Sequence, residues 1–378
     1  MKAVTYQGVK KVKVQEVEEP ILEYQDDIII RTTACSICGS DLHCYHGMIP
    51  SMSKNYITGH EVVGVVEEVG LEVTKVKKGD KVVVPFNIAC GKCYYCRNKL
   101  ESQCEVANRN YEIGATFGCS RLYGDYPGVQ AEFVRVPFAN FAPFRLPEHN
   151  ELSDGELVLL TDALPTAYWA VEQAGVKAGD TVIILGCGPI GLLTQKMAWF
   201  RGAKRVIAVD HIQTRLQHAH KTNKVEIYNF KKINELGNLL KEITHGGADS
   251  VIDCVGMSGK ITSGELLQSL VGLHGGSMGA ITMASQSVRI GGTVALVGVY
   301  GTRYNAFPLG DFFSRNVTLR MGMAPVVHLI PGLFDMLLNE KIIVKDVISH
   351  EMPLDDAKKA YKMFDVHKDE CLKIILKP

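Results

Sequence analysis

Apolar and polar residues alternate along the first 150 positions of the chain. Residues 11–14 and 27–32 follow a period of two, and short apolar runs bounded by Gly or Pro lie at 62–66 and 81–85. This alternation is typical of half-buried β-strands. The pattern does not settle into the 3.6-residue period of an amphipathic helix. It therefore predicts a β-rich N-terminal part.

The pattern changes after about residue 155, where strand-like runs alternate with segments of helix length. The predicted strands lie at residues 181–185, 205–210, 225–230, 250–255, 293–297 and 317–321. Strands that alternate with helices form βαβ units and a parallel sheet. Further along, a helix is expected at about 327–338, an amphipathic stretch at 354–364 and a last strand at 372–376. The fold class expected from this order is α/β.

Length, charge and cysteine content narrow the class of protein. A chain of 378 residues exceeds a usual single core, so two domains are expected. The 41 basic and 41 acidic residues balance, whereas binding to nucleic acid or to an anionic membrane generally needs excess positive charge. We therefore expect neither partner. An odd number of cysteines, eleven, and the lack of an apolar signal segment favour a reducing compartment, the cytoplasm.

Four cysteines lie close together in one short polar segment. Cys90, Cys93, Cys96 and Cys104 have the spacing C-x2-C-x2-C-x7-C. Four thiolates at such spacing can complete a tetrahedral shell around one zinc ion. A redox pair needs only two thiols, and a disulfide framework would spread over a small secreted domain. The spacing predicts a structural zinc lobe at about residues 88–106.

A glycine-rich turn follows the predicted strand at 181–185. It consists of Gly186, Cys187, Gly188, Pro189, Ile190 and Gly191, which form a G-x-G-x-x-G motif. In this motif the first glycine permits a tight turn, the second lets the backbone approach a pyrophosphate, and the third lets helix and strand pack closely. The first N–H groups of the following helix then face the phosphates. The motif predicts a dinucleotide pocket.

Asp210 closes the next predicted strand, 19 positions after Gly191. An acid at this place accepts hydrogen bonds from the adenosine ribose and repels a 2′-phosphate, which favours NAD over NADP. Arg215 lies about one helical turn further on, where a basic side chain would tolerate NADP. A glycine-rich turn with an unrelated surface acid is the alternative interpretation.

A second group of metal-binding side chains lies further towards the N-terminus. A catalytic zinc needs three protein ligands and an open fourth position. Cys38 and His60 supply a thiolate and an imidazole, but the spacing leaves the third ligand open, with Glu61 and Asp162 among the candidates. Cys35 and Cys38 also form a C-x-x-C, which would suit a redox pair. We expect Cys35 to be a buried thiol instead.

These residues resemble a known family. G-H-E at residues 59–61, followed by glycines at 64 and 70, is similar to the zinc alcohol dehydrogenase signature of the medium-chain dehydrogenase/reductase superfamily. C-G-S-D at 38–41, the four-cysteine segment and the glycine-rich turn occur in the family order. The resemblance implies a GroES-like catalytic domain at 1–155, a Rossmann coenzyme domain at 156–322 and a return to the catalytic domain at 323–378.

The resemblance also implies an activity. It predicts two zinc ions per subunit and reversible hydride transfer between a small alcohol or aldehyde and NAD. Members of the family are homo-oligomers, so a dimer or a homotetramer is expected. A polyol or L-threonine dehydrogenase of the same superfamily shares the G-H-E region and remains an alternative. A non-catalytic, dinucleotide-sensing zinc protein is the alternative from another class, and it predicts one zinc per chain and no turnover.

Individual roles follow from the same resemblance. Asp162 lies where the family carries its third zinc ligand, and aspartate there is typical of glutathione-independent formaldehyde dehydrogenases and formaldehyde dismutases. Ser40 would contact the substrate oxygen, His43 would lie at the outer end of a proton relay, and Glu61 would approach the zinc transiently. The chain lacks the long insertion that this subgroup carries after the glycine-rich turn. The choice between dehydrogenase and dismutase therefore stays open.

Overall fold

The computed structural model describes residues 1–109, 113–258, 277–301 and 306–378. The chain separates into unit 1, which comprises Met1–Pro165 and Pro325–Pro378, and unit 2, which comprises Thr166–Ala324. The sequence placed the first boundary near residue 155, ahead of Asp162. The division lies further on because the Phe86 N–H donates to the Thr161 carbonyl at 3.0 Å and ties that segment to unit 1.

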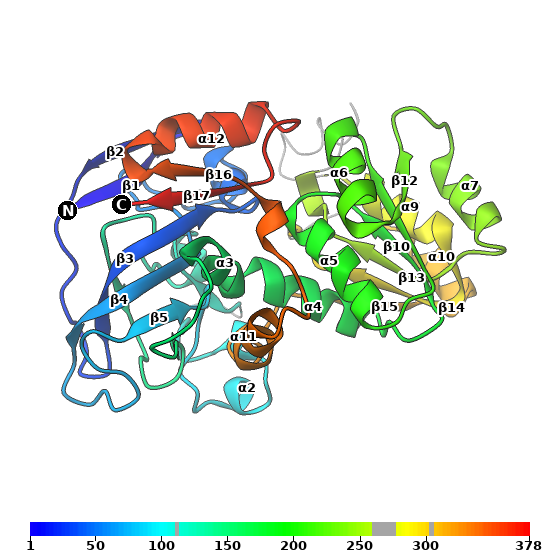
Figure 1. The fold of residues 1–378 in the computed structure, drawn as a ribbon. Helices are drawn as coiled ribbons and strands as arrows, with labels where there is room; N and C mark the ends of the chain where they lie inside the picture. Colours follow the sequence, from blue (N-terminus) through cyan, green and yellow to red (C-terminus); the bar gives the residue numbers. More distant parts are fainter. Residues whose placement is uncertain (110–112, 259–276, 302–305) are drawn as a thin grey trace. The chain divides into compact units, whose positions relative to one another are not determined.

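Unit 1 is built on a seven-stranded sheet (Figure 1). The strand order is β16 (Ile348–Pro353), β17 (Lys373–Lys377), β3 (Ile28–Ile37), β4 (Val62–Val69), β5 (Lys81–Val84) and β9 (Phe144–Arg145), with β8 (Phe133–Val136) also paired to β3. All pairs are antiparallel except β16 with β17. The last strand of the chain thus lies beside β3, and the C-terminal segment completes the N-terminal sheet.

The alternation seen in the sequence matches the buried face of this sheet. Ile28 and Ile30 on β3, Val62 and Val66 on β4, and Val82 on β5 belong to one core and are fully buried. Burial of each such side chain contributes about 1.5–3 kcal/mol. A separate hairpin of β1 (Lys2–Gly8) and β2 (Lys11–Glu16) and helix α12 (Ala357–Val366) add to the same core.

Short elements connect these strands in unit 1. They are α1 (Asp41–Tyr45), β6 (Asn87–Ile88), α2 (Tyr94–Arg97), β7 (Ala115–Thr116), α3 (Asp154–Val158) and α11 (Ile330–Leu338). Helix α3 begins with a capping box, in which Ser153 and Glu156 exchange hydrogen bonds. Helices α1 and α2 are each about one turn long, too short to give the 3.6-residue period that would reveal them in the sequence.

Unit 2 contains the predicted parallel sheet. Its order is β12 (Glu226–Asn229), β11 (Arg205–Asp210), β10 (Thr181–Leu185), β13 (Ala248–Asp253), β14 (Val288–Leu296) and β15 (Thr318–Met321), and every neighbouring pair is parallel. The chain runs outward from β10 to β12 and then returns to the other side of β10 at β13. Ligands bind at such a reversal, beyond the carboxyl ends of the strands.

Helices connect the strands of unit 2. They are α4 (Ala163–Gln173), which spans the division between the units, α5 (Pro189–Phe200), α6 (Gln213–Asn223), α7 (Leu236–Ile243), α9 (Gly279–Ser287) and α10 (Leu309–Ser314). The parallel α/β arrangement confirms the predicted fold class. Strand β14 begins at Val288, five positions before the predicted start, because it continues through Gly291 and Gly292 with an irregular register. Glycine pairs of this kind hide a strand from pattern analysis.

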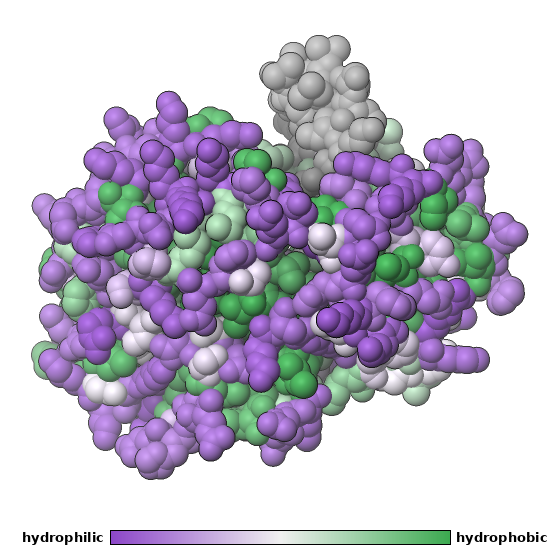
Figure 2. Space-filling model, turned by 45° about the horizontal axis from the view of Figure 1, so that its top comes forward, coloured by the Kyte–Doolittle hydropathy of each residue, from purple (hydrophilic) through white to green (hydrophobic). Residues whose placement is uncertain are grey.

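The surface is mostly polar on the face drawn in Figure 2, where apolar residues are scattered among hydrophilic ones. Within the described parts of the chain, the helices are all too short or too polar to cross a lipid bilayer.

Candidate functional site

Three segments of unit 1 bring four potential metal ligands together. Cys38 follows β3, His60 and Glu61 precede β4, and Asp162 lies between a 3-10 turn and α4. One ligand atom from each side chain lies within 4.8 Å of the others. The Cys38 Sγ is 3.3 Å from Asp162 Oδ2, and His60 Nε2 is 3.4 Å from the same oxygen. The antiparallel register, with Cys35 opposite Val62, places the end of β3 beside the start of β4.

The cluster is buried, and its charges influence one another. Burial and the Asp162 carboxylate raise the pKa of the Cys38 thiol. Burial by itself lowers the pKa of His60, but Asp41, Asp162 and Cys38 raise it well above its usual range. The rise in the His60 pKa, against the effect of burial, shows that the neighbouring acidic groups favour positive charge here. A divalent cation would satisfy this preference and would also favour the thiolate of Cys38.

Asp41 orients the imidazole of His60. Its Oδ1 lies 3.0 Å from His60 Nδ1, and its Oδ2 accepts a hydrogen bond from the Cys38 N–H at 2.9 Å. A carboxylate on Nδ1 keeps the proton there and leaves Nε2 to face the cluster. The ring is therefore held in the tautomer and orientation that metal coordination needs.

Glu61 has a different environment from Asp162. Its Oε2 accepts hydrogen bonds from Ser36 Oγ and from the ammonium group of Lys373, a buried residue of β17. Its Oε1 is buried and has no hydrogen-bond partner among the described residues. A buried carboxylate oxygen is costly without a cation or donor nearby. The thiol, imidazole and two carboxylates therefore fit a zinc ion.

Sequence reasoning did not find Lys373. A single lysine in a terminal strand is usually expected to reach solvent, because lysine is almost never fully buried unless it is paired. Only the pairing of β17 with β3 shows that this lysine lies inside the sheet, beside Glu61.

Ser40 and His43 lie on the segment that follows Cys38. Ser40 precedes α1, and its Oγ is 3.4 Å from His60 Nε2, so the hydroxyl borders the cluster. His43 is a buried residue of α1, and burial lowers its pKa to about 4. The imidazole of His43 is therefore neutral at neutral pH.

The four-cysteine segment also converges in the structure. The sulfurs of Cys93 and Cys96 are 3.5 Å apart, those of Cys93 and Cys104 are 3.9 Å apart, and those of Cys90 and Cys96 are 4.0 Å apart. Zinc–sulfur bonds of about 2.3 Å in a tetrahedron place the sulfurs about 3.8 Å apart. Backbone N–H groups of Lys92 and Cys93 donate to the Cys90 sulfur at 3.4 Å. This arrangement fits a zinc ion with four thiolate ligands.

Two contacts anchor this lobe within unit 1. Nδ1 of His328 is 3.0 Å from both carboxylate oxygens of the buried Glu101, and the Val326 N–H donates to Asn87 Oδ1 at 3.0 Å. Both contacts join residues more than 200 positions apart. Sequence analysis did not identify them, since neither partner belongs to a motif.

The glycine-rich turn of unit 2 has the geometry that its sequence predicts. Gly186 has φ +98°, a left-handed conformation that favours glycine. A Cβ on Gly191 would lie 2.0 Å from the Gly186 carbonyl oxygen, so a side chain is excluded there. Helix α5 begins at Pro189 with Gly188 as its N-cap. The backbone N–H groups at this end of the helix can bind an anion. Arg215 lies nearby, because its Nη1 would be 3.9 Å from a Cβ placed on Gly188.

Asp210 lies beside this turn, at the end of β11. Its Oδ2 accepts from the Cys187 N–H at 2.7 Å, and its Oδ1 accepts from the N–H groups of His211 and Ile212 at 2.6 and 3.0 Å. Burial works to raise the pKa of Asp210, but these hydrogen bonds and the His211 side chain lower it below its usual range. The carboxylate is therefore ionised and held next to the glycine-rich turn.

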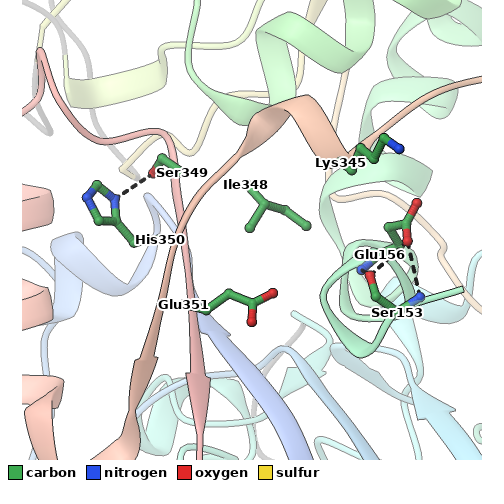
Figure 3. Close-up of a pocket in the computed structure, with 7 residues that line it drawn as sticks. All are labelled: Ser153, Glu156, Lys345, Ile348, Ser349, His350 and Glu351. Atoms are coloured by element: carbon green, nitrogen blue, oxygen red, sulfur yellow. Dashed lines mark hydrogen bonds between the residues drawn. The ribbon is translucent and has the colours of Figure 1, made fainter.

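A separate pocket of unit 1 contains none of these residues. It has a volume of about 280 Å³ and is lined by Ser153, Glu156, Lys345, Ile348, Ser349, His350 and Glu351 (Figure 3). Several of its polar groups already pair with each other or with neighbours. Glu156 bonds to Ser153, and His350 Nδ1 is 3.0 Å from Ser349 Oγ. The pocket therefore offers few free polar groups to a ligand.

Comparisons with known proteins agree with this geometry. Residues 24–148 match the profile of the alcohol dehydrogenase GroES-like domain, and residues 189–270 match that of the zinc-binding dehydrogenases. The chain is 57% identical to a zinc-type alcohol dehydrogenase-like protein of Bacillus subtilis, with 100% of both chains covered. It is 30% identical to a glutathione-independent formaldehyde dehydrogenase of the same organism, covering 100% of this chain and 97% of the relative.

Comparison with solved structures also finds alcohol dehydrogenases. The alcohol dehydrogenase TADH from Thermus sp. ATN1 is 34% identical and superimposes with a TM-score of 0.83, covering 100% of this chain and 99% of that one. The match extends over both units and includes the segments that carry the metal ligands and the glycine-rich turn. This chain is therefore an oxidoreductase of the zinc-binding alcohol dehydrogenase family.

Proposed function

We propose that this protein is a zinc-dependent dehydrogenase that transfers hydride reversibly between a small alcohol or aldehyde and NAD. The observation that carries this proposal is the buried cluster in which ligand atoms of Cys38, His60 and Asp162 lie within 4.8 Å of one another. A thiolate, an imidazole and a carboxylate make the three-ligand set of a catalytic zinc site, which keeps a fourth position for substrate.

Asp162 is the proposed third ligand rather than Glu61. Its Oδ2 faces both the Cys38 sulfur and the His60 Nε2, whereas one oxygen of Glu61 is already engaged by Lys373 and Ser36. The family resemblance implies that aspartate at this place is typical of glutathione-independent formaldehyde dehydrogenases, and one such enzyme is 30% identical to this chain. Formaldehyde and short alcohols are therefore the proposed substrate class.

The neighbouring side chains would manage the proton that an alcohol loses on oxidation. A zinc ion held by Cys38, His60 and Asp162 supplies Lewis-acid activation of the substrate oxygen when bound. The Ser40 hydroxyl, 3.4 Å from His60 Nε2, would accept the substrate hydrogen bond. Neutral His43, on helix α1 three positions after Ser40, would accept the proton at its ring nitrogen and pass it outward. Asp41 keeps the His60 proton on Nδ1 throughout.

Metal content and turnover together test the proposed function. The purified full-length protein should contain two zinc ions per chain and reduce NAD when ethanol or formaldehyde is supplied. Sorbitol and threonine serve as comparison substrates, because preference for either would support a polyol or L-threonine dehydrogenase. One zinc per chain without turnover on any of the four would contradict the proposal and would favour a dinucleotide-sensing protein.

Asp210 is proposed to select NAD over NADP. Replacement of Asp210 by asparagine keeps an oxygen for the Cys187 N–H but removes the charge that repels a 2′-phosphate and binds the ribose. Hydrogen bonds to charged groups contribute about 1.5–3 kcal/mol, or about 10- to 100-fold in affinity. The ratio of kcat/KM for NAD to that for NADP should fall by about this factor. Glu226→Gln, a charge change on the neighbouring strand β12, is the control, and an unchanged ratio in Asp210→Asn would refute the assignment.

We also propose that the protein forms a homo-oligomer. β15 is the edge strand of the unit 2 sheet, and apolar side chains on it and on the preceding α10 are exposed, among them Leu309, Phe313 and Met321. An exposed strand edge with apolar neighbours is suited to pairing with a second chain. Light scattering of the full-length protein should give the mass of a dimer or a tetramer, and a monomer would contradict this.

A further inference from the structure

Gln130 contacts groups that hold two of the proposed metal ligands, Cys38 and His60, although it is not a metal ligand itself. It lies just before β8 and is completely buried. Its Nε2 donates to the Ser36 carbonyl at 2.9 Å and lies 3.5 Å from Asp41 Oδ2. Ser36 lies two positions before Cys38, and Asp41 holds the ring of His60. The amide of Gln130 therefore contacts both the backbone that leads to Cys38 and the carboxylate that orients His60.

The partners of this amide determine its orientation. The Oε1 of Gln130 accepts hydrogen bonds from Thr58 Oγ1 at 2.7 Å and from the Tyr361 hydroxyl at 2.9 Å. The Ser36 carbonyl can only accept, so the nitrogen of the amide has to face it. Both donors and both acceptor positions of the side chain are then used. A buried amide that is fully satisfied in one orientation has little freedom to move.

The backbone next to Gln130 shapes the approach to His60. The N–H groups of Gln130 and Val129 donate to the carbonyls of Thr58 and Gly59, each at 3.0 Å. Gly59 has φ +87°, and a Cβ on it would lie 2.4 Å from Gln130 Cγ. The side chain at position 130 thus occupies the space that any residue other than glycine would need immediately before His60.

We propose that Gln130 is a positioning residue of the metal site. Its amide holds Asp41 in the orientation in which Asp41 keeps His60 Nε2 directed at Cys38 and Asp162. This inference rests on the proposed zinc-dependent function. The connection runs through Asp41, whose Oδ1 is 3.0 Å from His60 Nδ1 and whose Oδ2 receives the Cys38 N–H. Loss of a group that orients a metal ligand typically lowers metal affinity or activity about 10- to 100-fold.

The rate of zinc release tests the role of Gln130 without reference to turnover. In Gln130→Glu the side chain keeps its length and an oxygen for Thr58 and Tyr361, but it loses the donors to Ser36 and Asp41. The zinc-loaded variant, mixed with the chromogenic chelator 4-(2-pyridylazo)resorcinol, should release one zinc per chain about 10-fold faster than the wild type. The second zinc, in the four-cysteine lobe, is an internal reference whose release should be unchanged. The absorption spectrum of the Co²⁺-substituted protein should change as well.

Tyr361→Phe is the matched control. It removes one hydrogen bond from the acceptor side of the same amide and leaves both donors in place, so zinc release should stay near the wild-type rate. Gln130→Met, which introduces no buried charge, repeats the comparison if the glutamate variant does not fold.

A double variant tests the route through Asp41. Because Gln130 acts through this carboxylate, Asp41→Asn combined with the position-130 change should release zinc no faster than Asp41→Asn alone. Wild-type release in the position-130 variants, or additive effects in the double variant, would overturn the inference. A wild-type protein that takes up only one zinc would instead contradict the proposed function, so the two failures are distinguishable.

Discussion

Replacement of His60 by alanine is expected to abolish alcohol oxidation while NAD binding is retained. His60 supplies the imidazole of the buried cluster, and its Nε2 lies 3.4 Å from Asp162 Oδ2. A Lewis-acid metal contributes several kcal/mol of transition-state stabilisation, which corresponds to about a thousandfold or more in rate. The glycine-rich turn and Asp210 belong to unit 2, so the coenzyme pocket stays intact. Steady-state rates and fluorescence titration with NADH measure the two effects.

The C-x-x-C segment provides a matched pair of variants for the same prediction. Cys38→Ala should lose one zinc per chain and the activity, as His60→Ala does. Cys35→Ala removes a fully buried thiol three positions away that lies outside the metal-binding group. That variant should keep two zinc ions and nearly normal rates. Alcohol oxidation that persists in Cys38→Ala or His60→Ala would rule out the zinc mechanism.

Replacement of Cys93 by alanine should reduce stability far more than it changes the chemistry. Cys93 lies 3.5 and 3.9 Å from the sulfurs of Cys96 and Cys104, so its loss opens the four-thiolate shell. The free energy of binding a structural zinc contributes directly to folding. A loss of about 3 kcal/mol or more would lower the melting temperature by about 10 °C.

Thermal unfolding with and without a chelator checks the role of Cys93. The chelator should lower the melting temperature of the wild type towards that of Cys93→Ala and should lower that of the variant much less. Cys119→Ala is the control, because Cys119 is also half-buried but lies outside both metal-binding groups. A normal melting curve for Cys93→Ala would show that the lobe does not depend on its metal.

Local patterns in the sequence predicted the secondary structure of both units well. The strands at 181–185 and 205–210 have the bounds that the sequence predicted, because each is a short, almost continuous run of buried apolar residues, which is typical of a strand covered on both faces of a parallel sheet. The convergence of the four cysteines was predictable for a similar reason. Within 15 residues of chain, spacing alone limits how far apart the sulfurs can lie.

The catalytic cluster could be predicted only in part. Cys38 and His60 were recognisable as ligands by residue type, but spacing did not distinguish Asp162 from Glu61 as the third. The structure brings both carboxylates into the cluster, and the proposed preference for Asp162 rests on the engagement of Glu61 by Lys373, which lies 312 positions away. The segment before Asp162 also joins unit 1 through a contact that is distant in sequence, the hydrogen bond from the Phe86 N–H to the Thr161 carbonyl.

The sequence by itself determined the fold class, the four-thiolate lobe and the glycine-rich turn with its acid, since each depends on residues that are near one another in the chain. Tertiary structure decided that the carboxylates of Glu61 and Asp162 converge on Cys38 and His60, and how Gln130 and Tyr361 support this cluster. Those contacts join residues between 89 and 231 positions apart, and they form only when the strands of unit 1 pair in one register. A shift of one residue in β3, β4 or β17 would turn these side chains to the opposite face of the sheet.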